Sequence, residues 1–153
     1  MKFAWSARTQ RAMPIELKEA RSRTFHGTKR RIFHLLEEMG TSGDQIWPFA
    51  SQPFMRSPGP LTPQRTEEWH LGIHAVLTEV VPEERIVWRF LNDGVDGTHG
   101  FHLSSEGKET TLDYRVEAKL SDTDGRLLWR RLEDHFERST EALFDKIARV
   151  LKR

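Results

Sequence analysis

The sequence contains no cysteine. Disulfide frameworks, thiolate nucleophiles and thiolate metal sites are therefore excluded, and the chain is compatible with a reducing compartment. It also lacks any run of about 20 apolar residues, the length that a membrane-spanning helix needs. Residues 1–14 have no continuous apolar segment of the kind found in signal peptides. We therefore expect a cytoplasmic protein that has no integral membrane association.

An excess of charge of one sign is missing as well. The chain has 24 basic and 23 acidic residues, interspersed, for a net charge of +1. This balance leaves no electrostatic footprint for nucleic acid, so no nucleic-acid partner is predicted. No Gly-rich phosphate loop, HExxH motif or ordered serine–histidine–aspartate set is present. The sequence thus predicts no cofactor and shows no complete catalytic constellation.

The length of 153 residues suits one domain. We assign residues 1–14, which end at Met13-Pro14, to an N-terminal tail and residues 15–153 to the domain. A domain of this size buries roughly 68–70% of its unfolded surface. That is enough for a core and a cavity.

Strict alternation predicts strands between Trp69 and Leu120. The clearest strand is Thr110–Leu120, and others are predicted at Trp69–Leu77, Arg85–Leu91 and around His99–Leu103. A first strand is predicted at Ile15–Phe25, although its alternation is poor after Leu17. A phase shift near Val76 suggests a bulge that bends the sheet. Inner faces are predicted to carry Trp69, Leu71, Ile73, Ala75, Leu77, Ile86, Trp88, Phe90, His99, Phe101, Leu103, Thr110, Leu112, Tyr114, Val116, Ala118 and Leu120.

Two helices are predicted. The first covers Thr28–Met39, with Thr28 as its cap and Gly40 as its stop. The second runs from Arg126 to the end of the chain, and its apolar stripe comprises Leu128, Leu132, Phe136, Leu143, Ile147 and Val150. The predicted fold class is α+β, a curved antiparallel β-sheet wrapped around a long C-terminal α-helix.

The segment Thr41–Gln64 has no regular pattern. Five of the seven prolines lie between Pro48 and Pro63, among aromatic residues such as Trp47 and Phe54. A long loop in a compact domain is usually functional or disordered, and its aromatic content argues against disorder. We predict a lid over one end of the core.

Several stretches carry a family resemblance. They are Trp47-Pro48, residues 59–63 (GPLTP), residues 81–90 (VPEERIVWRF) and residues 97–101 (GTHGF). In this element order the chain resembles the START-like superfamily, also called SRPBCC, which has the helix-grip fold and includes polyketide cyclase/dehydrase-like and lipid-transport-like proteins. The resemblance covers about residues 15–150. It implies one cavity, between the sheet and the C-terminal helix, for lipids, sterols, aromatic polyketides or plant hormones.

Polar residues on the predicted inner faces are candidates for chemistry. His99, Tyr114 and His135 are candidate catalytic residues, since histidine titrates near neutrality and a buried phenol donates a hydrogen bond. Each of them could instead satisfy a backbone group in an ordinary core. The predicted ligand-binding residues are Trp69, Ile73, Trp88, Phe90, His99, Phe101, Leu112, Tyr114, Leu132, His135, Phe136 and Ser139.

Other polar residues are predicted to lie outside the cavity. His70 and His74 share the polar face of their strand, and no third ligand is spaced to complete a metal site, so none is predicted. His102 also falls on an outer position. Glu19, Arg21 and Arg23 share parity with apolar residues, which leaves two readings open. Either the first strand is an edge exposed on both sides, or its charges are buried and paired.

Three functions are compatible with these patterns. The first is a binding or carrier module for a small hydrophobic molecule, either lipid-like or aromatic. The second is a polyketide cyclase/dehydratase-like enzyme that uses the same cavity. The third is a protein-interaction domain, similar to a chaperone cofactor, that binds through the charged face of the last helix.

Overall fold

In the part of the chain that the structure describes, one antiparallel sheet and two helices form the fold. The computed structural model describes residues 15–120 and 123–153. The strands are β1 (Ile15–His26), β2 (Met55–Arg56), β3 (Glu67–His70), β4 (Ile73–Val81), β5 (Arg85–Phe90), β6 (Val95–Glu106) and β7 (Glu109–Leu120). The helices are α2 (Lys29–Glu37) and α3 (Thr123–Leu151). The sheet has seven strands in the order β1-β7-β6-β5-β4-β3-β2, which agrees with the predicted α+β class.

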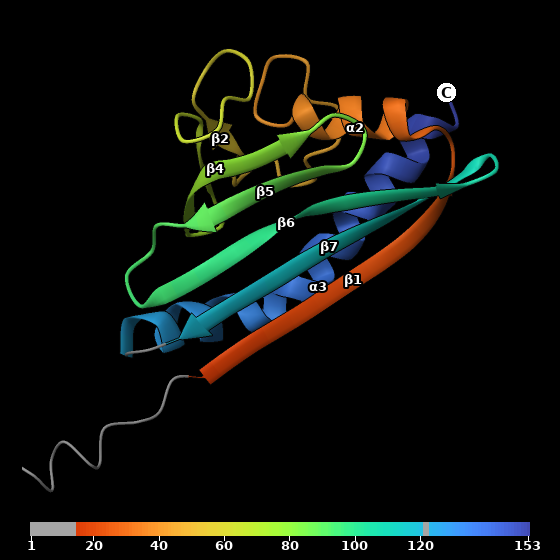
Figure 1. Ribbon diagram of the computed structural model, residues 1–153. Coiled ribbons are helices and arrows are strands. Elements are labelled where there is room, and N and C mark those ends of the chain that lie inside the picture. The colour runs from red at the N-terminus through yellow and green to blue at the C-terminus, as the bar shows by residue number, and fades with distance from the viewer. Residues whose placement is uncertain (1–14, 121–122) are drawn as a thin grey trace, which may run out of the picture.

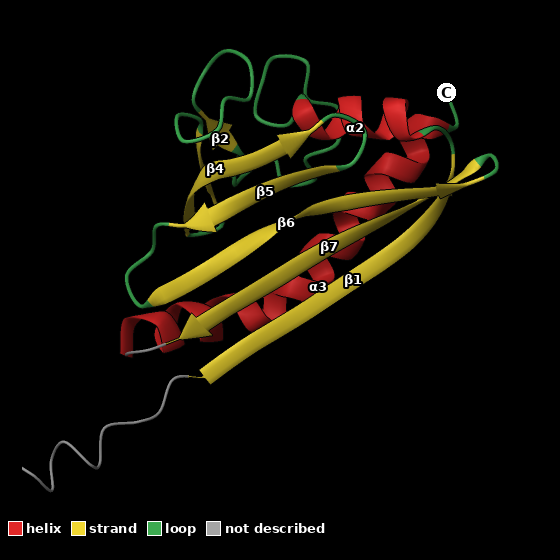
Figure 2. Cartoon of the chain, viewed as in Figure 1, coloured by secondary structure: helices red, strands yellow, loops and turns green. Residues whose placement is uncertain are grey.

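The long helix α3 lies across one face of the sheet (Figure 1). The strands curve around it, while α2 and the long loop close the remaining part of that face (Figure 2). Its 29 residues span roughly 43 Å at 1.5 Å per residue, which is enough to cross the whole sheet. The predicted helix-grip arrangement is therefore confirmed.

The apolar stripe of α3 divides into two parts. In the C-terminal half, Leu143, Phe144, Ile147 and Val150 are buried in the main core. In the N-terminal half, Leu128, Leu132 and Phe136 are only half-buried. Buried apolar area stabilises in proportion to its extent, so the C-terminal half anchors the helix. The N-terminal half leaves room between itself and the sheet.

The first helix begins as predicted. The hydroxyl of Thr28 accepts a hydrogen bond from the backbone N–H of Arg31 at 3.1 Å, which satisfies one of the free donors of the first turn. Gly40 adopts a φ of 81° just after the helix. The helix ends at Glu37, two residues before the predicted Met39. Its buried residues Ile32, Leu35 and Leu36 join the main core.

The predicted strand Trp69–Leu77 is wrong in one respect, because a tight turn divides it. Leu71 and Gly72 connect β3 to β4 with φ values of 50° and 83°. Two successive left-handed residues are what a two-residue hairpin with the matching twist requires. The turn reverses the side-chain order before it, so Glu68 and His70 point inward and Trp69 points outward, 43% exposed. The register shift in β4 lies between Leu77 and Glu79, close to the predicted bulge.

Strand β1 is an edge strand, and two of its charged residues, Arg21 and Arg23, form ion pairs with α3. Arg23 contacts Glu141 and also bonds to Asp145 at 2.8 Å, while Arg21 lies 3.7 Å from Glu137. For Arg21 and Arg23 the two predicted possibilities therefore combine, because the strand is an edge and both side chains are paired at the rim of α3. Such half-exposed pairs contribute little to stability.

The predicted tail, residues 1–14, and residues 121–122 before α3 lie outside the described residues. Within the described ranges, neither helix is both long enough and apolar enough to cross a membrane.

Substitution of Gly72 tests the turn that sets the direction of β3. Gly72→Ala places a Cβ at a φ of 83° and should lower the free energy of unfolding by about 1–2 kcal/mol in urea titration. Gly27→Ala is the matched control. Its backbone has no left-handed φ, and the added Cβ would meet only the Leu151 side chain at 3.4 Å. An equal loss of unfolding free energy in the two variants would contradict a requirement for a left-handed glycine in the β3–β4 turn.

Candidate functional site

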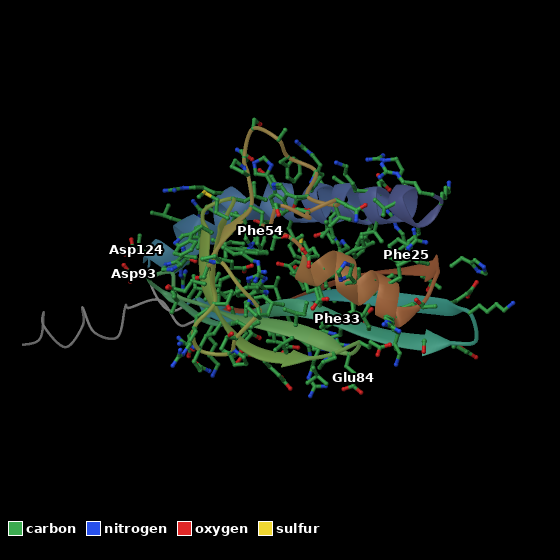
Figure 3. The ribbon with its side chains drawn as sticks, turned by 90° about the horizontal axis from the view of Figure 1, so that it is seen from above. Phe25, Phe33, Phe54, Glu84, Asp93 and Asp124 are labelled. Atoms are coloured by element: carbon green, nitrogen blue, oxygen red, sulfur yellow. The ribbon has the colours of Figure 1, made fainter. Side chains whose placement is uncertain are left out.

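A small cavity lies between the sheet and the N-terminal half of α3. Its volume is about 80 Å³. Seen from above in Figure 3, Phe54 lies in the layer between the strands and α3. The wall is mainly apolar and is formed by Met39, Trp47, Phe54, Leu71, Ile73, Phe90, Phe101, Val116, Trp129, Leu132, Phe136 and Leu143. The polar groups in the wall are Glu68, His70, His99, Tyr114, His135, Ser139 and Thr140.

Four of these polar residues form a connected cluster. Oε1 of Glu68 lies 2.5 Å from Nε2 of His99 and 3.2 Å from Nε2 of His70. Nδ1 of His99 is hydrogen-bonded to the hydroxyl of Tyr114 at 2.9 Å. The side chains of Glu68, His70 and His99 are 1%, 8% and 3% exposed. We call Glu68, His70, His99 and Tyr114 the polar cluster.

Burial and charge act in opposite directions on Glu68. Burial alone would raise the pKa of this carboxyl, but the adjacent His70 and His99 outweigh it and lower the pKa to about 2. The carboxylate is therefore ionised at neutral pH. For Tyr114, burial and then the negative charge of Glu68 raise the pKa far above its ordinary value. Its phenol stays protonated and available for hydrogen bonding.

Aromatic rings hold the two imidazoles in place. The ring of Phe54 stacks on His70 with centroids 4.7 Å apart, and Trp47 contacts the same ring edge-on at 5.5 Å. Phe90 lies 5.0 Å from His99. Trp47 and Phe54 come from the proline-rich loop, so this loop covers the end of the cavity where the polar cluster lies.

The cavity adjoins a larger groove on the outside. The groove has a volume of about 780 Å³ and shares Leu71, Leu132, His135 and Ser139 with the cavity. Its rim includes Phe49, Gln52 and Pro53 from the loop and Arg130, Arg131, Asp134 and Arg138 from α3. The route from solvent to the polar cluster therefore runs between the β3–β4 turn and α3.

Nine of the twelve predicted ligand-binding residues lie in the cavity wall, although ligand binding by them stays a prediction. These are Ile73, Phe90, His99, Phe101, Tyr114, Leu132, His135, Phe136 and Ser139. His135 is exposed at the mouth, whereas His99 and Tyr114 lie at the inner end. The candidate catalytic residues are thus not brought together as one group of three.

Three predicted residues do not line the cavity. Trp69 points to the outer face because of the β3–β4 turn and stacks on His74. Trp88 and Leu112 point inward, but they pack in the main core, which also contains residues of α2. Parity alone predicts the face of a strand, and it does not say where along that face the core leaves a cavity.

His70 and Glu68 are the functional candidates that the pattern did not predict. The expectation that His70 faces outward is wrong, because the hairpin places His70 and His74 on opposite faces. His74 does lie outside, half-exposed and 2.8 Å from Glu67, and His102 does not line the cavity. The available signal was Gly72, since a glycine inside a strand pattern often marks a turn or a bulge.

Comparison with solved structures shows that other proteins share the fold of this chain. Neither a protein-family model nor a curated protein matches the sequence. Ms6760 from Mycobacterium smegmatis has a similar structure, with a TM-score of 0.64 and 14% identity over 89% of this chain and 91% of that chain. CalU16 from Micromonospora echinospora has a TM-score of 0.56 and 12% identity over 86% and 82%.

A third similar structure belongs to a longer chain. DynU16, a protein in the dynemicin biosynthetic locus, has a TM-score of 0.58 and 14% identity over 88% of this chain but only 47% of its own. At these identities the similarity extends to the fold and no further. It is consistent with the helix-grip architecture expected from the resemblance to the START-like superfamily.

Removal of one hydroxyl tests the polar cluster. Tyr114→Phe leaves Nδ1 of buried His99 without its partner and should lower the free energy of unfolding by about 1–3 kcal/mol in urea titration. Thr111→Val is the control, because it removes a hydroxyl pair with Thr24 that is exposed between β1 and β7. A smaller loss of stability for Tyr114→Phe than for the control would contradict a buried hydrogen bond between Tyr114 and His99.

Proposed function

We propose that the protein binds a small hydrophobic molecule, aromatic or lipid-like, between the sheet and α3. The main support is an apolar cavity with one polar end. It lies under the N-terminal half of α3, which is not anchored in the main core. Ligand sites commonly combine an apolar wall with a few convergent polar groups. Here the polar cluster would orient the ligand and the aromatic wall would supply the contact area.

The cavity volume sets how the ligand would bind. At about 80 Å³ it is smaller than the roughly 300–1,000 Å³ of typical ligand pockets. The adjoining groove of about 780 Å³ shares four wall residues with it. We infer that a ligand inserts a compact end into the cavity and extends into the groove. Outward movement of the N-terminal half of α3 would enlarge the site, since its residues Leu128, Leu132 and Phe136 are only half-buried.

One structural neighbour suggests which ligand class to test first. DynU16 is a protein in the dynemicin biosynthetic locus and has a similar fold at 14% identity. We therefore choose an aromatic, natural-product-like molecule as the first class to test. The aromatic wall supplied by Phe90, Phe101 and Phe136 suits a flat ring, because offset stacking and edge contacts stabilise such rings.

A fluorescent probe tests the site without knowledge of the natural ligand. Anilinonaphthalene sulfonate, an anion with apolar aromatic rings, should bind the folded protein with saturation at one site per chain. Leu132→Trp fills the passage between cavity and groove and should weaken this binding at least about tenfold, or about 1.4 kcal/mol. Fluorescence titration below the unfolding temperature measures the number of probe sites per chain and the probe affinity of each variant.

The same helix supplies the control. Leu127→Trp introduces the same side chain at an exposed position of α3 that lies outside the cavity wall. Its probe affinity should stay within about twofold of the wild type. Equal weakening by both variants, or fluorescence that never saturates, would contradict binding in the cavity.

One observation favours the enzyme alternative. Tyr114, His99 and Glu68 form a chain that joins a phenol, an imidazole and a carboxylate at the inner end of an apolar cavity. Such a chain can remove a proton from a carbon between two carbonyl groups and return it, which is the elementary step of cyclase and dehydratase chemistry. The protein-interaction alternative stays a prediction, since it has no specific support in the described residues.

Proton exchange tests the enzyme alternative. An acetoacetyl thioester in D₂O should lose its central C–H signal at least about tenfold faster with the wild type than with His99→Phe, as followed by NMR, an effect of about 1.4 kcal/mol on the barrier. His74→Phe, on the outer face, should exchange at the wild-type rate. Equal exchange in all three proteins would remove the catalytic assignment and leave the binding function intact.

A further inference from the structure

We propose that Glu68, His70 and His99 bind a divalent transition-metal ion, with Zn²⁺ as the best match. Their ligand atoms all lie within 4.8 Å of one another. Two imidazole nitrogens and one carboxylate oxygen form a donor set that binds zinc in proteins and leaves a coordination position open. The proposal concerns this cluster alone and holds whether or not the cavity takes an apolar ligand.

The hydrogen bonding of the cluster is the first supporting observation. Oε1 of Glu68, Nε2 of His99 and both ring nitrogens of His70 are buried and have no hydrogen-bond partner of acceptable geometry. The close N···O contacts of Glu68 with His70 and His99 therefore lack N–H groups aligned with the carboxylate oxygen. Buried polar atoms nearly always have partners, and an ion between them would satisfy three at once.

The surroundings of the imidazoles are the second observation. Nδ1 of His99 is hydrogen-bonded to Tyr114, so with Nδ1–H as donor to the phenol oxygen, Nε2 carries a lone pair that is free for an ion beside Glu68. Outer contacts of this kind fix the tautomer and the ring direction of metal-binding histidines. The ring of His70 is fixed in turn by stacking on Phe54.

The distances define what metal binding would change. Oxygen and nitrogen ligands lie about 2.0–2.2 Å from zinc, so two of them are separated by roughly 3.3 Å in a tetrahedron. The contact between Glu68 and His70 fits this at 3.2 Å, whereas the contact between Glu68 and His99 is shorter at 2.5 Å. The ion would move the carboxylate of Glu68 away from His99 by less than about 1 Å. The open position would then face the cavity.

Metal binding is tested on the full chain without a polyhistidine tag, after removal of bound metal with a chelator. Zn²⁺ alone is titrated, and metal content after dialysis is measured by mass spectrometry. We expect one Zn²⁺ per chain and, in the wild type, changes of the ring nitrogen signals of His70 and His99 in NMR spectra. His70→Phe, which retains an aromatic ring against Phe54, should weaken binding at least about tenfold.

The matched control is His74→Phe. His74 lies on the outer face of the adjacent strand β4 and contacts Glu67, so its replacement should leave Zn²⁺ affinity unchanged. If His70→Phe does not fold by circular dichroism, Glu68→Gln, which keeps the side-chain shape, takes its place. Substoichiometric metal in the wild type, or NMR changes at His74 instead of His70 and His99, would overturn the proposal. Equal affinities of the inner and outer variants would do the same.

Discussion

The carboxylate of Glu68 is removed from water and lies in a mainly apolar wall, and a charge in that position is stable only beside compensating groups. His70 and His99 supply this compensation from β3 and β6, strands that are not neighbours in the sheet. Their meeting therefore requires the sheet to curve and the loop to cover them. The charge of Glu68 is stabilised only when a compensating group lies within about 3 Å of it. This requirement restricts the positions of the side chains at the polar end of the cavity more strictly than apolar packing restricts the others.

The sequence predicted the fold well because the fold depends on long periodic signals. Thr110–Leu120 alternates over its whole length, and the stripe of α3 recurs over several turns, so both elements are confirmed near their predicted limits. The error at Glu68 and His70 has a local cause. A strand has a period of two, so the two-residue turn at Leu71-Gly72 exchanges the inner and outer faces of everything before it. A site that spans such a turn is lost when the segment is treated as one strand.

The cavity itself follows from a difference in packing that periodicity does not encode. The stripe of α3 keeps a helical spacing along the helix, yet its C-terminal part meets the main core, whereas Leu132 and Phe136 border the cavity. The difference comes from what faces each half, namely the core that includes α2 in one case and the aromatic loop and β3 in the other. Local opening free energies vary with buried apolar contact, so the N-terminal half of α3 is the part able to move.

The polar cluster and the N-terminal half of α3 together define how the site can work. A bound ion would take up the charge of Glu68 and leave a coordination position toward the cavity, while an empty cluster would offer the carboxylate and two imidazoles directly. In both cases the polar groups lie at the closed inner end, and the groove with Arg130 and Arg138 lies at the open end. A molecule with an apolar ring or chain between two polar ends satisfies both regions at once.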